Sequence, residues 1–160
     1  MKKVFFALFT ALLSMQMAVS ACEAARGSFY TKAYDTVNPQ RPILFDQQYF
    51  APRDGLRYTL GTGHLVIIKG GLYTVSYGFA QNGASGTAAL ALDGQVVEGS
   101  QIFGNLVNQL TSATITFEIK EGQILSLINA SDGAFELGAS DNTINAYITV
   151  SQIEVDDDED

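Results

Sequence analysis

The 160-residue sequence has no tryptophan, one cysteine (Cys22), one histidine (His64) and only 9 lysine or arginine residues. A single cysteine excludes an intrachain disulfide and a zinc site with several cysteine ligands. A single histidine excludes a histidine-rich metal site. The few basic residues, against 17 acidic ones, cannot form the clustered surface that nucleic acid requires. We therefore expect one domain with no metal, no cofactor and no nucleic-acid partner.

Residues 1–21 have the three parts of a secretory signal peptide. Lys2 and Lys3 give a positive start, residues 4–13 are almost all apolar, and small residues such as Ala21 precede the expected cleavage site. The apolar run is shorter than the roughly 20 residues of a membrane-spanning helix. We therefore expect an exported protein, located outside the cell or in the cell envelope.

Cys22 lies where the signal would be cut. Residues 19–22, Val-Ser-Ala-Cys, are similar to a bacterial lipobox, in which the cysteine becomes the lipidated first residue. The alternative is ordinary cleavage after Ala21 or Ala24. Lipidation is favoured because an unpaired thiol is unusual in an exported protein. Cys22 is then the lipidation candidate and the chain's only contact with a membrane, followed by a short linker over residues 22–26.

The acidic residues are concentrated at the C-terminus. Without residues 1–21 the chain keeps 7 basic and 17 acidic residues, a net charge of −10, and six of the acids lie in residues 154–160. Such a run repels itself and stays solvated. We therefore expect a disordered acidic tail at 154–160, following one domain over residues 27–153.

The mature chain has the alternation of apolar and polar residues that is typical of strands, and no helical periodicity. The expected strands are 27–36, 43–46 (a short edge strand), 64–69, 72–80, 86–92, 113–120, 123–130 and 143–153. Glycine turns predict that 64–69 and 72–80 form one hairpin and that 113–120 and 123–130 form another. A further turn is expected at Asp93-Gly94. About eight strands at this spacing predict an antiparallel sandwich or barrel.

Four segments carry a resemblance to a known family. They are residues 71–77 (GLYTVSY, similar to G-x-Y-x-V-S-Y), 90–100 (LALDGQVVEGS, similar to L-x-V-N-G-x-x-V-P-G-S), 119–129 (IKEGQILSLIN, similar to L-x-x-G-D-x-L-x-L-x-N) and 145–150 (NAYITV, similar to N-A-x-L-T-V). In this order they resemble the jelly rolls of complement component one-q and tumour necrosis factor. The resemblance is closest to the C-terminal globular domain of bacterial collagen-like exosporium glycoproteins. It covers residues 27–153, and no Gly-X-Y run is present, so a stalk is not implied.

The resemblance implies an all-β fold, an antiparallel two-sheet jelly-roll sandwich of ten strands that assembles as a homotrimer. In the family, the sheet with the first, third, sixth and last strands faces the threefold axis, which here means 27–36, 71–80, 111–120 and 143–153. The less apolar faces of these strands hold the expected trimer-interface residues: Tyr30, Tyr34, Thr74, Ser76, Thr114, Thr116, Tyr147 and Thr149. A one-residue slip would exchange the faces, and in a monomer these residues would meet solvent.

No catalytic constellation is found, so we expect no enzyme. His64 opens a strand, Gly83-Ala84-Ser85-Gly86 departs from G-x-S-x-G, and residues 61–63 lack the third glycine of a phosphate loop. The carboxylates expected in turns, two of which would suffice for a calcium site, are Asp93, Glu98, Asp132 and Asp141. The glycosylation sequon at residues 129–131 is interpreted as the end of a strand.

Three functions remain in competition. The favoured one is an exported, non-enzymatic, trimeric surface module for adhesion, recognition or envelope structure, with an unidentified protein or glycan ligand. The alternative is a carbohydrate-binding jelly roll, with or without calcium, which the absence of tryptophan disfavours. The third is an enzyme on a β scaffold, for which His64 would be the only imidazole.

Overall fold

The two ten-residue strands of the structure, 71–80 and 110–119, alternate between more buried and less buried side chains. The computed structural model describes residues 24–83, 85–138 and 143–153. In β6 (Gly71–Ala80) the side chains of Tyr73, Val75, Tyr77 and Phe79 are fully buried, as the sequence predicts. The expected signal peptide, Cys22, Asp141 and the acidic tail lie outside the described residues. Within the described part of the chain, no helix is long and apolar enough to span a membrane.

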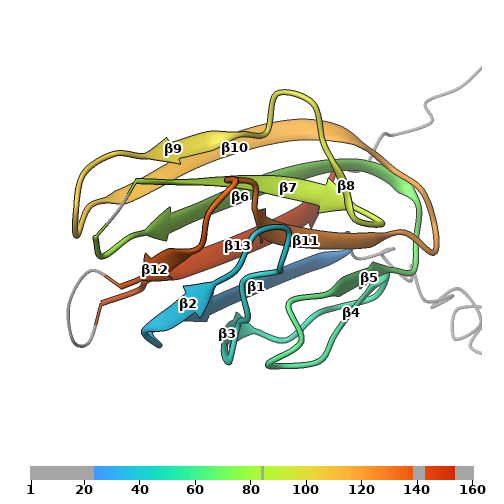
Figure 1. The fold of residues 1–160 in the computed structure, drawn as a ribbon. Coiled ribbons are helices and arrows are strands. Elements are labelled where there is room, and N and C mark those ends of the chain that lie inside the picture. Colours follow the sequence, from blue (N-terminus) through green and yellow to red (C-terminus); the bar gives the residue numbers. More distant parts are fainter. Residues whose placement is uncertain (1–23, 84, 139–142, 154–160) are drawn as a thin grey trace, which may run out of the picture.

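Two antiparallel sheets form the sandwich (Figure 1). The first has the order β10-β6-β13-β1-β3, with β10 Leu110–Ile119, β13 Ala146–Gln152, β1 Arg26–Thr31 and β3 Gln47–Phe50. The second has the order β4-β5-β11-β7-β8, with β4 Leu56–Tyr58, β5 Leu65–Ile67, β11 Ile124–Asn129, β7 Gly86–Leu92 and β8 Gln95–Val96; β9 (Ile102–Gly104) also pairs with β7. A small ribbon joins β2 (Asp35–Val37) to β12 (Phe135–Leu137). The four ranges expected to share one sheet do so.

Two expected hairpins are wrong. β5 and β6 lie in different sheets, and so do β10 and β11, because β10 pairs with β6 whereas β11 pairs with β5 and β7. Gly70 and residues 120–122 are therefore corners at which the chain crosses the sandwich. The corners pack together, since a Cβ on Gly70 would lie 3.0 Å from the Glu121 nitrogen. A short glycine turn has the same sequence pattern in a hairpin and in a corner.

The turn at Asp93-Gly94 does form a hairpin, between β7 and β8. Both residues have positive φ, 50° and 81°, as in a type I′ turn. The Asp93 carboxylate also accepts hydrogen bonds from the Ile124 N–H at 2.9 Å and from Gln123 Nε2 at 3.2 Å. This carboxylate therefore fastens the hairpin to the start of β11.

Residues 43–46 form no strand, contrary to expectation. Pro42 makes one isolated bridge to Ile128, and the Ile43 N–H donates to the Leu127 carbonyl, but Pro42 has no N–H with which to continue a ladder. Strand β1 also ends at Thr31, short of the expected Thr36. Asn145 intervenes there, because its Nδ2 donates to the carbonyls of Lys32 and Ala33.

A buried asparagine at the end of β11 fixes the segments that surround it. Asn129, the last residue of β11, is fully buried, and its Nδ2 donates to the carbonyls of Val37 at 2.7 Å and Gly133 at 2.9 Å. Its backbone also pairs with Gln40 and Arg41. One side chain thus holds β2 and the β11–β12 connection in place.

The buried tyrosines make the fold sensitive to alkali. Burial raises the pKa of Tyr73 and of Tyr77 above the ordinary value of 10.0. Their hydroxyls donate to the carbonyls of Lys69 and Ser100. A phenol with a higher pKa in the folded state holds its proton more tightly there. Its contribution to stability is therefore complete below pH 10.0 and is lost as the pH rises above that value.

We expect the unfolding temperature to be flat from neutral pH to about pH 9 and to fall steeply above about pH 10. Differential scanning calorimetry across this range measures it. The Tyr77→Phe variant removes one of three such ionisations, since burial also raises the pKa of Tyr58, and gives a shallower fall. An equally steep fall in a Tyr73→Phe/Tyr77→Phe double variant would show that other groups control the alkaline limit.

Candidate functional site

The outward face of the five-stranded sheet carries rows of hydroxyl side chains at the expected positions. Strand register aligns Thr114, Ser76, Thr149 and Ser28 across β10, β6, β13 and β1. Within this row, Ser76 Oγ lies 2.8 Å from Thr114 Oγ1, and Ser28 Oγ lies 2.8 Å from Thr149 Oγ1. Because the hydroxyls bond to one another across the strands, the row is a fixed, flat and mildly polar surface.

A second row of hydroxyl side chains lies two residues further along each strand. Thr116, Thr74, Ser151 and Arg26 are aligned there, and Thr74 Oγ1 lies 3.0 Å from Thr116 Oγ1. We name the two sets the hydroxyl face: Ser28, Thr74, Ser76, Thr114, Thr116, Thr149 and Ser151. Thr114 and Thr116 are exposed in the single subunit, whereas Thr74, Ser76 and Thr149 are half-buried. The face is therefore most open to solvent along β10.

Tyrosines border the hydroxyl face on its third row. Register aligns Ser112, Gly78, Tyr147 and Tyr30. Gly78 makes room for its neighbour, because a Cβ there would lie 2.8 Å from Tyr147 Cε1 and 2.8 Å from the Thr111 carbonyl oxygen. Tyr30 stacks on Tyr49 of β3, with ring centroids 4.5 Å apart, and Tyr49 is 61% exposed. The sheet thus ends in an aromatic edge at β1 and β3.

Tyr34 does not join the other seven expected interface residues on the sheet. It lies in the connection between β1 and β2 and is 50% exposed. Its ring packs against Gly138, where a Cβ would lie 2.1 Å from Tyr34 Cδ1. The expectation that Tyr34 lies on the face assumed that β1 continues past Thr31. In the structure β1 ends at Thr31.

An exposed apolar patch at the opposite edge was not predicted from the sequence. It comprises Phe103, Leu106, Val107 and Leu110, which are 67%, 55%, 53% and 45% exposed. We name it the β9–β10 edge patch. Leu110 begins β10 and belongs to the same alternating set as Thr114 and Thr116, so the patch continues the hydroxyl face. The sequence feature that could have revealed the patch is a set of three large apolar residues, Phe103, Leu106 and Val107, in a segment where no turn requires them.

The β9–β10 edge patch borders a depression of about 340 Å³ on the second sheet. Phe103 lines it together with Thr87, Ser131 and Asp132. Ser131 Oγ accepts the Thr87 N–H at 2.7 Å. An exposed aromatic ring beside hydroxyl and carboxylate oxygens is the combination that stacks on and hydrogen-bonds to a sugar.

The described residues supply no catalytic geometry. His64 Nδ1 lies 3.0 Å from Ser126 Oγ on β11, and no carboxylate in the described part of the chain bonds to this imidazole, so nothing orients it as a base. Among residues 24–83, 85–138 and 143–153, no three His, Cys, Asp or Glu side chains are grouped to hold a metal ion. Of the carboxylates considered for calcium, Asp93 is engaged at its own turn.

This arrangement of two sheets defines the class of fold, the jelly roll of complement component one-q and tumour necrosis factor. The individual comparisons are distant. The chain is similar to Eiger TNF from S. frugiperda, with 17% identity, a TM-score of 0.56 and coverage of 86% of this chain and 97% of that chain. It is similar to the globular domain of zebrafish complement 1qA protein, with 11% identity, a TM-score of 0.58 and coverage of 81% and 98%. Murine APRIL at pH 8.5 gives 9% identity, a TM-score of 0.59 and coverage of 82% and 100%.

These identities establish the fold alone. No family model and no curated protein sequence matches the chain. The expectation that the chain is not an enzyme stays a prediction, and the expected interface residues depend on the geometry of the sheet face.

Replacing Gly78 tests how tightly this face is packed. Gly78→Ala is expected to destabilise the fold by about 1–3 kcal/mol, because the new methyl group overlaps a backbone oxygen as well as the Tyr147 ring. Urea unfolding measures the change. Gly133→Ala is the matched control, since a Cβ there meets nothing within 4 Å, and its effect should stay within about 0.5 kcal/mol. Equal effects of the two substitutions would contradict the close packing.

Proposed function

We propose that the chain is an exported, non-enzymatic surface module that works as a homotrimer in adhesion, recognition or envelope structure. The observation that carries the proposal is that two unlike surfaces lie at opposite sides of the five-stranded sheet. The β9–β10 edge patch lies at one side and the aromatic edge of Tyr30 and Tyr49 at the other, with the hydroxyl face between them.

A closed ring needs such a pair. In a cyclic trimer each subunit offers one surface to the preceding copy and a different surface to the next. Tyrosines give a large contact area and a hydroxyl that finds a partner. The hydroxyl rows are already bonded among themselves, so covering them leaves few polar groups unpaired. Four exposed apolar residues on one edge also indicate a surface that is covered in the assembly.

Membership of the trimer interface is proposed for Tyr30, Thr74, Ser76, Thr114, Thr116, Tyr147 and Thr149, and no longer for Tyr34. We further propose that residues 1–21 direct export, that Cys22 carries a lipid, and that the finer likeness to exosporium globular domains is genuine. The support is the sequence pattern described above. The loops at the ends of the sandwich, away from the sheet face, would then meet the ligand.

The mass of the mature protein in solution tests the trimer. We expect three subunits at micromolar concentration by light scattering. Thr114→Arg places three like charges close together, and it should weaken assembly by about 100-fold or more. It leaves the subunit folded by circular dichroism, because Thr114 is exposed. Thr59→Arg, also exposed and beyond the end of β4, is the control and should stay trimeric. A monomeric parent chain would contradict the proposal.

The depression beside Phe103 favours carbohydrate binding as a second function. It predicts signals on a glycan array that Phe103→Ala abolishes and that a chelator leaves intact, because the described residues form no metal cluster. Loss of binding with the chelator would instead require a calcium site formed on binding. In the proposed trimer a neighbouring subunit covers Phe103. Glycan-array signals that come from a trimeric protein and depend on Phe103 would therefore contradict that interface.

A further inference from the structure

The two ends of the described chain lie side by side. The Gln152 N–H donates to the Ala25 carbonyl at 2.7 Å, and the Ile153 N–H donates to the Leu72 carbonyl at 2.8 Å. Arg26 pairs with Ser151 at the start of β1. Whatever follows Ile153 therefore begins beside the first residues of the domain.

Basic side chains surround this point. The Arg53 N–H donates to the Arg26 carbonyl at 3.0 Å, and the Lys69 N–H donates to the Gly55 carbonyl at 3.2 Å. Gly55 lies between Lys69 and the start of the domain, because a Cβ on it would be 2.8 Å from Ala25 Cβ and 3.0 Å from Lys69 Cβ. We name Arg26, Arg53 and Lys69 the basic collar; all three are exposed.

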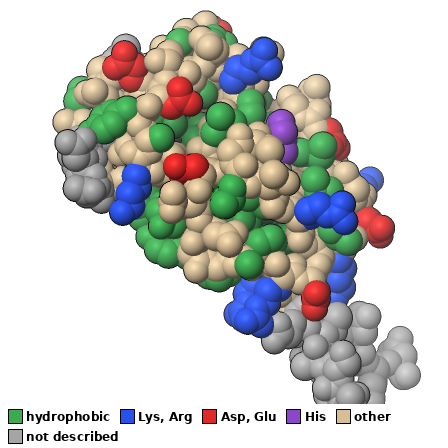
Figure 2. Space-filling view, turned by 90° about the horizontal axis from the view of Figure 1, so that it is seen from below, with side chains coloured by type: hydrophobic (Ala, Val, Ile, Leu, Met, Phe, Trp, Pro, Cys, Tyr) green, Lys and Arg blue, Asp and Glu red, His purple; other side chains and the backbone are tan. Residues whose placement is uncertain are grey.

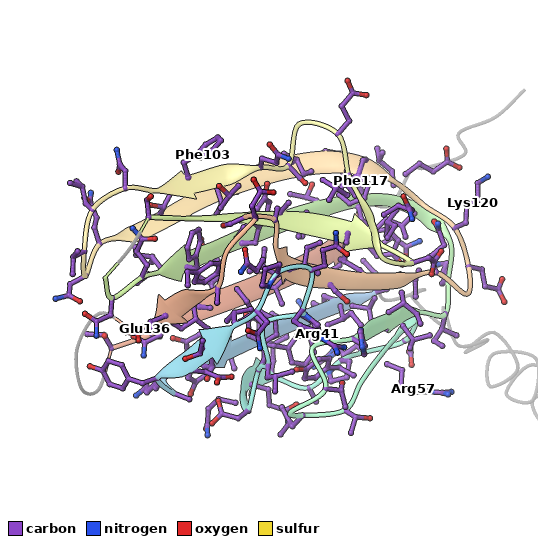
Figure 3. The ribbon with its side chains drawn as sticks, in the orientation of Figure 1. Arg41, Arg57, Phe103, Phe117, Lys120 and Glu136 are labelled. Carbon is purple, nitrogen blue, oxygen red and sulfur yellow. The ribbon has the colours of Figure 1, made fainter. Side chains whose placement is uncertain are left out.

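Further cations lie at the same end of the sandwich. Arg57 and Lys120 extend from it in Figure 3, and Figure 2 shows Lys and Arg side chains gathered toward the end where the described chain stops. The carboxylates of this end include Asp54 within the collar, Glu118 and Glu121 beside the β10–β11 corner, and Asp93, which is bonded to Gln123 and Ile124 just after that corner. Five of the seven basic residues of the mature chain are thus found here; of the other two, Lys32 follows the opposite end of β1, and Arg41 lies away from this end in Figure 3.

We propose that the acidic segment 154–160 docks on the basic collar of its own subunit. The segment carries six carboxylates in seven residues and begins where the collar lies. Fully extended it reaches roughly 24 Å, enough to cover all three cations. The occupant is therefore supplied by the chain itself, with a charge opposite to that of the surface at which it starts.

Because segment 154–160 is covalently attached beside the collar, weak ion pairs are sufficient to hold it there. Exposed ion pairs contribute little individually, but a short linker holds the segment at an effective concentration in the millimolar range. The contact is screened by salt, since the Debye length falls from about 10 Å at 0.1 M to about 3 Å at 1 M. Any acidic ligand of the collar has to compete with the tail.

Carbodiimide cross-linking of the full mature protein tests the contact, because it joins a carboxylate to an amine only where the two touch. Peptide mass spectrometry should find residues 154–160 joined to Lys69, several-fold more often at low salt than in molar sodium chloride. Lys32 is the internal control, because it follows the other end of β1 and should be joined rarely. Equal yields at Lys69 and Lys32, or a yield at Lys69 that ignores salt, would overturn the proposal.

Charge reversal provides the second measurement. Arg26→Glu with Arg53→Glu should reduce the Lys69 cross-link several-fold, whereas Lys32→Glu with Arg41→Glu should leave it unchanged. Circular dichroism shows whether each variant is folded. Mixing isotope-labelled and unlabelled protein identifies the subunit that supplies the tail, and cross-links found only between copies would contradict docking on the same subunit. Neither result depends on the trimer, so a monomeric protein can still satisfy the test.

Discussion

The structure depends on the burial of one face of β6 between the two sheets. Tyr73, Val75, Tyr77 and Phe79 are fully buried on that face, and the two tyrosine hydroxyls are bonded to backbone carbonyls at the corner after β5 and near the start of β9. Since side chains alternate strictly along a strand, burying these four directs Thr74, Ser76 and Gly78 outward. The register of β10 and β13 against β6 then aligns the hydroxyl rows. The geometry of the candidate interface is thus a consequence of the core.

Strand identity could be predicted where one face is buried and the other is not. The sequence indicated the outward residues of β6, β10 and β13 correctly because their alternation is long and regular. The sequence did not predict which strands pair where the pairing depends on contacts between residues far apart in the chain. A glycine turn does not specify whether the next strand stays in its sheet. Strands β2, β4, β9 and β12, each of three residues, show no pattern of their own, whereas β5, of the same length, lies within the expected strand 64–69. Tyr34 was misplaced because Asn145, more than a hundred residues away, caps the end of β1.

At 9–17% identity the comparisons establish the fold and do not extend to the outward faces of the sheets. A surface of bonded hydroxyls between an apolar edge and an aromatic edge is therefore a property of this chain, and its use has to be inferred from its own residues. Both the interface and the basic collar are surfaces of this kind.

Asn129 has a consequence for how the protein can be produced. The residue opens an Asn-Ala-Ser acceptor for N-linked sugar, yet its amide nitrogen is the buried donor to Val37 and Gly133. An oligosaccharyltransferase would modify this nitrogen on the unfolded chain, and the attached glycan could not be accommodated between β2 and β11. Secretion from a eukaryotic host would then yield misfolded material, whereas bacterial secretion, which leaves the asparagine bare, would allow the sandwich to close.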